Sequence, residues 1–214
     1  MPRTRTNITT GLVIALLSAT NAFAGDSPEG IREYARLIGA GDPVAGKDKS
    51  ALCQSCHGED GNSATSDFPK LAGQYAAYIQ KQISNFKIGT RKHPVMADIA
   101  ANLTNNQDLL DISAYFASQK QMKGASTVIN KAGQYRFLDG NVCVSCHGVN
   151  GKGLAPNNPA APVIGGQHKD YLVKQLKDFR SGARTNETSG LMTKIAVLMS
   201  DAEIEDLASY VSGL

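Results

Sequence analysis

The feature that most constrains this chain is a six-residue motif that occurs twice. Cys53-Gln-Ser-Cys-His57-Gly58 returns ninety residues later as Cys143-Val-Ser-Cys-His147-Gly148, and the two copies contain all 4 cysteines of the 214-residue chain. An internal repeat of this size indicates two domains built on one plan, although the length alone would also allow a single domain.

The spacing C-x-x-C-H is the attachment signal for c-type haem, because two thiols add to the haem vinyl groups and the adjoining His can bind the iron. The sequence therefore predicts two covalently bound haem c groups (iron). The attachment cysteines and the axial histidines are Cys53, Cys56 and His57 in the first half, and Cys143, Cys146 and His147 in the second.

Two other kinds of site use paired cysteines, and the spacing here favours neither. A zinc site built from two C-x-x-C pairs normally has about 15–20 residues between them, whereas residues 57–142 intervene here. A thioredoxin-like redox motif has no need of a His at the same offset twice. A zinc-stabilised binding module is kept as an alternative to a haem protein, and such a protein would be colourless.

The N-terminus has the composition of a secretory signal peptide. Arg3 and Arg5 precede a short apolar run over 11–19, and Ala22-Phe-Ala24 is a small-x-small cleavage site. The apolar run is well short of the roughly 18 residues of a membrane-spanning helix. We therefore expect residues 1–24 to be removed near Ala24/Gly25 and the mature protein to be periplasmic, with at most peripheral membrane association.

The charge gives no reason to expect a nucleic-acid partner. The chain has 22 basic and 19 acidic residues, and removal of Arg3 and Arg5 with the signal peptide leaves 20 basic residues against 19. Neither half forms a charged tail, so the mature polypeptide is close to neutral before the haem propionates are counted.

The repeat also divides the chain. We expect an N-terminal helical extension over 25–41, a first domain over 42–120, a linker over 121–127 and a second domain over 128–214. Each half has the order helix, haem motif, loop, helix, loop, helix, and no segment alternates convincingly as a strand. The predicted fold class is therefore all-α, with two tandem domains that each wrap around one haem.

Several local signals recur in both halves. A short helix from Ala45 should lead into the first motif. After each motif a helical stripe follows, which we assign to core packing: Tyr78, Ile79, Gln82, Ile83 and Phe86 in one half, and Tyr171, Leu172, Gln175, Leu176 and Phe179 in the other. Gly89 and Gly182 follow where a left-handed cap is expected. Capping boxes at Thr104-x-x-Gln107 and Ser200-x-x-Glu203 predict the starts of the last helices.

An electron-transfer haem needs its second axial position filled by Met or His. The repeat selects Met96 and Met192, because each lies eight residues before its predicted capping box, in what we expect to be a loop. By the same alignment Met199 pairs with Leu103, which indicates a packing role, and Met122 falls in the linker.

The two remaining histidines are not matched in this way. His93 has no histidine counterpart in the second half, and we expect it to be a solvated loop residue. His168 pairs with Tyr75, and we expect it at the surface.

These motifs together resemble the dihaem cytochromes c of the c4 type, which have two class I cytochrome c domains in tandem, and the resemblance covers essentially residues 42–214. It rests on the two C-x-x-C-H motifs and the two Met segments, and on Phe68-Pro-Lys-Leu-Ala-Gly-Gln, Lys174-Gln-Leu, Phe179-Arg180 and Arg184-Thr-Asn. It implies that the carbonyls of Pro69 and Pro162 accept the Nδ1 protons of His57 and His147. It also implies a pseudo-twofold interface between the domains, with the haem propionates nearby.

Because a matched Met closes the second axial position in both halves, the sequence predicts an electron carrier and not an enzyme, with outer-sphere transfer between Fe(II) and Fe(III), no catalytic residue and no small-molecule substrate at the iron. The partners follow from the resemblance. The implied donor is a quinol-oxidising complex or another cytochrome, and the implied acceptor is a terminal oxidase. The alternative is a dihaem electron-transfer subunit of a periplasmic oxidoreductase, such as a flavocytochrome sulfide dehydrogenase. A peroxidase-like enzyme needs one open iron position, whereas both halves here offer a matched Met.

Overall fold

The computed structural model describes residues 41–124, 128–154, 160–187 and 189–214. The first domain contains α2 (Pro43–Lys49), α3 (Ala51–His57), α4 (Ala76–Lys87), α5 (Pro94–Asn102) and α6 (Asn106–Ser118). The second contains α7 (Lys131–Leu138), the 3-10 turn η1 (Asp139–Asn141), α8 (Val144–His147), α9 (Lys169–Ser181), α10 (Leu191–Ala196) and α11 (Asp201–Ser212). The predicted signal peptide, and the predicted extension up to residue 40, lie outside the described residues.

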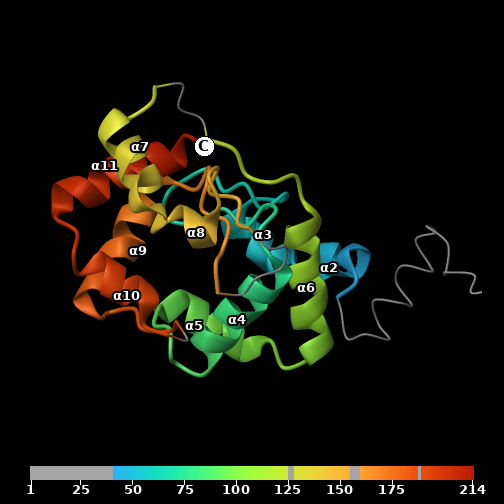
Figure 1. Ribbon diagram of the computed structural model, residues 1–214. Helices are drawn as coiled ribbons and strands as arrows, with labels where there is room; N and C mark the ends of the chain where they lie inside the picture. Colours follow the sequence, from blue (N-terminus) through green and yellow to red (C-terminus); the bar gives the residue numbers. More distant parts are fainter. Residues whose placement is uncertain (1–40, 125–127, 155–159, 188) are drawn as a thin grey trace, which may run out of the picture.

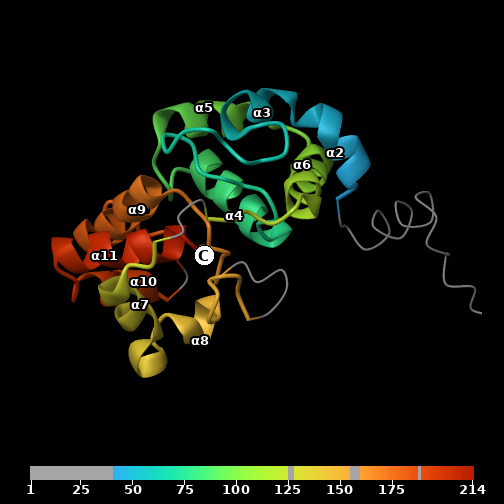
Figure 2. The same ribbon diagram turned by 90° about the horizontal axis from the view of Figure 1, so that it is seen from above.

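The described residues contain helices and no strands, as predicted. Figures 1 and 2 show two groups of helices in separate halves of the molecule, the first blue to green and the second yellow to red, with α4 and α9 at the boundary between them. None of the described helices is long and apolar enough to cross a membrane.

The first motif is reached through two short helices rather than the one predicted from Ala45. The Asp42 side chain accepts hydrogen bonds from the N–H groups of Val44 and Ala45, and Pro43 occupies the first helical position. These are preferred residues for a helix start, so α2 begins earlier than Ala45. The chain turns at Ser50 and continues as α3.

Each domain is closed by the same helix crossing, α2 over α6 in the first and α7 over α11 in the second. At both crossings a glycine lies against backbone. A Cβ on Gly46 would stand 2.0 Å from the carbonyl oxygen of Asp111, and one on Gly133 would stand 2.0 Å from that of Asp206. Only a residue without a side chain allows the two helices to approach so closely.

The helix caps agree with the sequence in three of four places. Ser200 and Glu203 form the predicted capping box, and Gly89 and Gly182 both have a φ of 77°, in the left-handed region. The box at Thr104 is wrong, because Asn105 caps α6 by accepting from the N–H of Gln107. The Gln107 side chain bonds Asp111 instead of reaching back to Thr104, and Asn is the stronger capping residue.

The predicted stripes supply the cores only in part, because their polar members Tyr78, Gln82, Tyr171 and Gln175 bond arginines at the contact between the domains. In the first domain Ile79, Ile83 and Phe86 of α4 pack with Ile112 and Phe116 of α6. In the second domain the core contains Phe137, Leu172, Met199, Ile204, Leu207 and Val211. The packing role predicted for Met199 is confirmed, since it is 6% exposed.

Candidate haem-binding sites

The first motif lies in the last turns of α3. Cys53, Cys56 and His57 are three and four residues apart, which places them on one face of the helix. Both cysteines are partly buried. Burial raises the pKa of the Cys53 thiol, so before haem attachment this thiol is protonated at neutral pH and less prone to disulfide exchange than an exposed cysteine.

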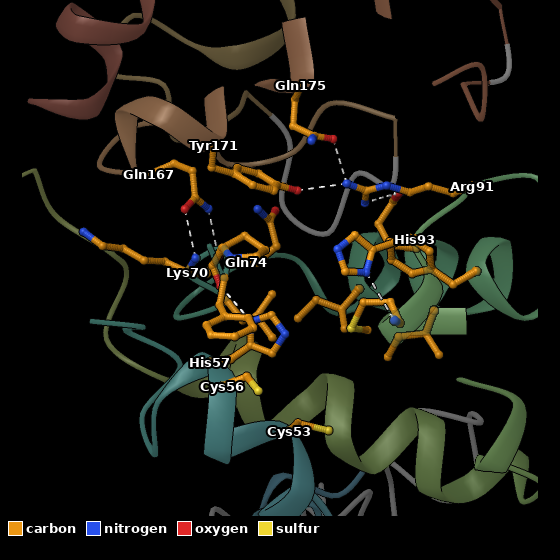
Figure 3. A pocket seen from close by; sticks show the side chains of 18 of the residues that line it. Cys53, Cys56, His57, Lys70, Gln74, Arg91, His93, Gln167, Tyr171 and Gln175 are labelled. Carbon is orange, nitrogen blue, oxygen red and sulfur yellow. Dashed lines mark hydrogen bonds between the residues drawn. The ribbon is translucent and has the colours of Figure 1, made fainter. Parts of the chain in front are cut away.

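This face of α3 opens onto a cavity of about 560 Å³, which is lined by α3, α4, α5 and α6 of the first domain and by α9 and its flanking segments of the second. Figure 3 shows Cys53, Cys56 and His57 at its lower edge. Its walls carry the apolar side chains of the first core, and its lining also includes Met96. Cofactor pockets are about 300–1,000 Å³ and mostly apolar. Two thiols, an imidazole and a thioether around such a cavity fit a covalently bound haem.

The His57 ring is fixed by the residue that the resemblance implies. Its Nδ1 lies 2.8 Å from the carbonyl oxygen of Pro69, and because a carbonyl can only accept, Nδ1 carries the proton and Nε2 remains for a metal. Burial lowers the pKa of His57, partly offset by the bond to Pro69. The imidazole is therefore neutral at pH 7, as a metal ligand must be.

The second motif repeats this arrangement. Cys143 precedes α8, which ends at His147, and His147 Nδ1 lies 2.9 Å from the carbonyl oxygen of Pro162. Burial lowers the pKa of His147 and raises that of the Cys143 thiol, against the opposing effect of Arg136. Both halves thus present two thiols and one oriented neutral imidazole.

The two methionines lie in helices, so the loops predicted around them are wrong. Met96 is in the first turn of α5, where the Nδ1 of His93 accepts a hydrogen bond from the Met96 N–H at 3.3 Å. Met192 is in the first turn of α10, where the Glu187 carboxylate accepts from the N–H groups of Met192 and Thr193, at 2.5 and 2.7 Å. Capping side chains upstream of each methionine make these short helices possible.

The structure brings Met96 to the first motif, since Met96 and Cys53 line one cavity and pack against one core. For Met192 it shows a half-buried residue on α10, and the described contacts do not join it to Cys143, Cys146 or His147. The pairing of Met192 with His147 stays a prediction from the repeat.

Of the predictions for the other two histidines, the one for His168 is wrong. His93 is exposed, as predicted, but it also caps α5. His168 is not a free surface residue, because its Nε2 lies 2.8 Å from the hydroxyl and 3.0 Å from the carbonyl oxygen of Ser63 in the first domain. His168 is therefore part of the contact between the domains.

Sequence reasoning missed most of that contact. Arg91 donates to Gln82, Tyr171 and Gln175, at 2.8 to 2.9 Å, and Figure 3 shows it reaching across to the second domain. From the second domain, the Arg184 guanidinium donates hydrogen bonds to Tyr78 and Gln82 of the first domain and to Gln175 of its own domain, at 2.6 to 3.3 Å. The signal was present in the repeat, since each arginine stands two residues after the glycine cap of its helix.

The start of the predicted linker is also packed between the domains. Met122 is 1% exposed and its N–H donates to the carbonyl of Ala72 in the first domain. The Gly124 N–H donates to the carbonyl of Leu214 in the second, and the Lys152 ammonium donates to the carbonyl of Met122 at 2.6 Å. These residues bind both domains; residues 125–127 lie outside the described part of the chain.

The fold and these sites define a c-type cytochrome with two haem-binding domains. The family model "Cytochrome c" matches residues 44–120 and again 131–214. Cytochrome c4 of Azotobacter vinelandii is 43% identical over 193 residues, which cover 82% of this chain and 90% of that one. The crystal structure of reduced recombinant cytochrome c4 from Pseudomonas stutzeri is 41% identical, with a TM-score of 0.74 over 82% of this chain and 100% of that one.

Another relative has a different name. The thiosulfate dehydrogenase electron acceptor of Stutzerimonas stutzeri (strain A1501) is 34% identical over 216 residues, covering 94% of this chain and 92% of that protein. The chain belongs to the cytochrome c family, and within it to the dihaem cytochromes c4. It therefore carries two covalently bound haem c groups and serves electron transfer with other redox proteins.

Proposed function

We propose that this protein is a periplasmic carrier that passes single electrons between larger redox proteins and performs no catalysis of its own. The observation that carries the proposal is the cavity in which Cys53, Cys56, His57 and Met96 meet. Two thiols anchor the haem there, and an imidazole and a thioether are available on the lining to fill both axial positions of its iron.

In this proposal the axial ligands are His57 with Met96 in the first domain and His147 with Met192 in the second. When bound, each haem supplies an iron that alternates between Fe(III) and Fe(II). The protein's part is to hold each imidazole through a proline carbonyl, to keep water off the iron with apolar walls, and to close the sixth position with a thioether. His/Met ligation raises the reduction potential.

Export and partners complete the proposal. We infer that residues 1–24 are removed near Ala24/Gly25, and that the donor is a quinol-oxidising complex or another cytochrome, with a terminal oxidase or similar protein as acceptor. Mass spectrometry of the mature protein tests the first point, since a chain beginning at Gly25 with two haems is expected. A mature chain that still contains Arg3 and Arg5 would contradict it.

A second candidate is the electron-accepting partner of a periplasmic dehydrogenase that oxidises sulfur compounds. The thiosulfate dehydrogenase electron acceptor that resembles 94% of this chain favours it. Purification from the native host separates the two candidates. A dehydrogenase subunit that co-elutes with the cytochrome supports the second, whereas a cytochrome that elutes alone and is oxidised by host membranes supports the first.

The axial ligands are tested with Met96→Ala and Met192→Ala, and Met199→Ala is the matched control because Met199 packs in a core. We expect each of the first two variants to lose half of the charge-transfer absorption of Met-ligated ferric haem and to bind carbon monoxide at one haem. The control should keep the native spectrum. A native protein that already binds carbon monoxide at one haem would overturn the carrier proposal.

A further inference from the structure

Two buried glutamines connect the domains, because each exchanges two hydrogen bonds with a backbone residue of the opposite domain. Gln167 of the second domain accepts from the Lys70 N–H through Oε1 at 2.9 Å, and donates to the Lys70 carbonyl through Nε2 at 2.9 Å. Figure 3 shows both bonds as a pair of dashed lines between Gln167 and Lys70. A primary amide and a backbone residue thus form a closed two-bond ring across the interface.

Gln74 of the first domain makes the equivalent contact with the second domain. Gln74 accepts from the Val163 N–H at 2.9 Å and donates to the Val163 carbonyl at 2.8 Å. Gln74 is 4% exposed and Gln167 is 5% exposed. Water therefore does not compete for these bonds, and the low local dielectric strengthens them.

The peptide groups that receive these glutamines are the ones that hold the haem-motif histidines. The Lys70 N–H and the Pro69 carbonyl belong to one planar peptide unit, and the Pro69 oxygen accepts from His57 Nδ1 at 2.8 Å. One continuous path therefore runs from Gln167 Oε1, through this peptide, to the His57 ring.

The second domain has the mirror path. The Val163 N–H and the Pro162 carbonyl form one peptide unit, and the Pro162 oxygen accepts from His147 Nδ1 at 2.9 Å. Gln74 stands at the far end of this path. Each histidine is thus linked through a single peptide to a glutamine of the opposite domain.

Hydrogen bonds that share a peptide group polarise one another, with a strengthening of about 10–30% per bond. An acceptor on the N–H makes the proline carbonyl more negative, so that it attracts the Nδ1 proton more strongly. Such an outer partner raises the basicity of a ligating imidazole. A more basic imidazole stabilises Fe(III) over Fe(II), which lowers the reduction potential.

We propose that Gln167 and Gln74 are positioning residues that set the reduction potential of the haem in the opposite domain. The inference rests on the proposed axial roles of His57 and His147. Docking of the two domains then tunes both haems, because neither peptide has its cross-domain acceptor unless the domains are together.

The test is a redox titration of the intact dihaem protein, with the two haems followed separately by NMR. Gln167→Met should raise the potential of the haem bound at Cys53 and leave the other unchanged, and Gln74→Met should do the reverse. We expect each reduction equilibrium to change about two- to threefold, which is about 18–28 mV at 59 mV per tenfold for one electron. In the reduced protein, the Nδ1 proton of only the affected histidine should move upfield as its hydrogen bond weakens.

The matched control is Tyr75→Phe, which removes another interdomain hydrogen bond, from the Tyr75 hydroxyl to the Lys152 carbonyl at 2.7 Å, but touches neither peptide. It should leave both potentials in place. If Gln167→Met does not fold, Gln167→Asn makes the same prediction, because the shorter side chain keeps a buried amide but withdraws it from the Lys70 N–H.

Shifts in the haem of the variant's own domain, equal shifts in both haems, or no shift at all would refute the proposal. The failure of the proposed function looks different. In that case the unmodified protein would lack the spectrum of two His/Met haems before any glutamine is changed.

Discussion

Replacement of Asp111 by Asn is expected to destabilise the first domain and to change its response to acid. Asp111 lies on α6, where its side chain is 3% exposed. Its carboxylate accepts from the Asp42 N–H at 2.8 Å, from the Gln107 side chain at 2.8 Å and from the Lys49 ammonium at 2.5 Å. One buried charge thus ties the start of α2 to the middle of α6.

The magnitude follows from these three bonds. A hydrogen bond to a charged group contributes about 1.5–3 kcal/mol, and removal of one partner of a buried ion pair costs about 3–5 kcal/mol. Asn keeps the shape and one acceptor, and the Lys49 side chain is 34% exposed and can turn to water. We therefore expect Asp111→Asn to lower the free energy of unfolding of the first domain by about 2–3 kcal/mol at pH 7.

The pH dependence has a definite sign. Burial alone would raise the pKa of Asp111, but the hydrogen bonds from Lys49, Asp42 and Gln107 outweigh burial and hold it below its usual range. A depressed carboxylate pKa stabilises the folded state above the unfolded value of about 3.9, and this contribution is lost as the pH falls through the folded value. The difference between the native protein and the variant should therefore be constant from pH 7 to about pH 5 and shrink in more acidic solution.

Hydrogen exchange measured by mass spectrometry reports the two domains separately, which a single melting curve of a two-domain protein does not. The control is Asp206→Asn, since Asp206 stands at the equivalent crossing of α7 and α11 and its side chain is bonded by Asn130 at 2.9 Å, with no cation in the described contacts. Amides of α6 should lose protection in the first variant, and those of α11 should change less in the second. Equal effects in the two domains, or a difference that persists at low pH, would refute this account.

Three further predictions concern a helix crossing, a helix cap and a haem. Gly46→Ala should cost about 3 kcal/mol or more because its Cβ would meet backbone, whereas Gly89→Ala, which has open space around it, should cost about 1 kcal/mol of backbone strain in the same unfolding assay. Asn105→Ala should destabilise α6 by about 1 kcal/mol and Thr104→Ala hardly at all. A larger effect of Thr104→Ala would instead support the capping box predicted at Thr104. Cys143→Ser should leave one thioether to the second haem, and mass spectrometry after denaturation should still find the first haem on the chain.

The parts of the structure that the sequence predicted are those that a few adjacent residues determine. The C-x-x-C-H motif is one helical turn, so its thiols and imidazole converge whatever surrounds them. The apolar residues of α4 and α9 recur at helical spacing, so each helix has one apolar side, and that side is buried in the core of its domain. Even the wrong capping box at Thr104 is an error of one residue, because two neighbouring residues can both cap and only their relative strength decides.

The parts that could not be predicted depend on where the second domain lies. Gln82 sits on a stripe of core residues and reads as packing, but its side chain accepts from Arg91 and from Arg184 of the other domain. His168 reads as a surface residue because its partner Ser63 is 105 positions away. Periodicity in one chain segment carries no information on such partners. The match between the two halves singles out Gln82 with Gln175 and Arg91 with Arg184, but it does not single out His168 or Ser63.

The repeat predicts which methionine faces each haem motif, but it does not predict how that methionine is held. The Met96 N–H donates to the imidazole of His93, three residues upstream, and the Met192 N–H donates to the carboxylate of Glu187, five residues upstream. The different spacing hides the equivalence of His93 and Glu187 from an alignment, although both accept from the same kind of backbone N–H. Only one of the two supports is anionic, and it lies beside Met192. The two iron sites are therefore equivalent in their proposed ligands and unequal in the charge beside them, so two haems bound by one plan need not have one potential.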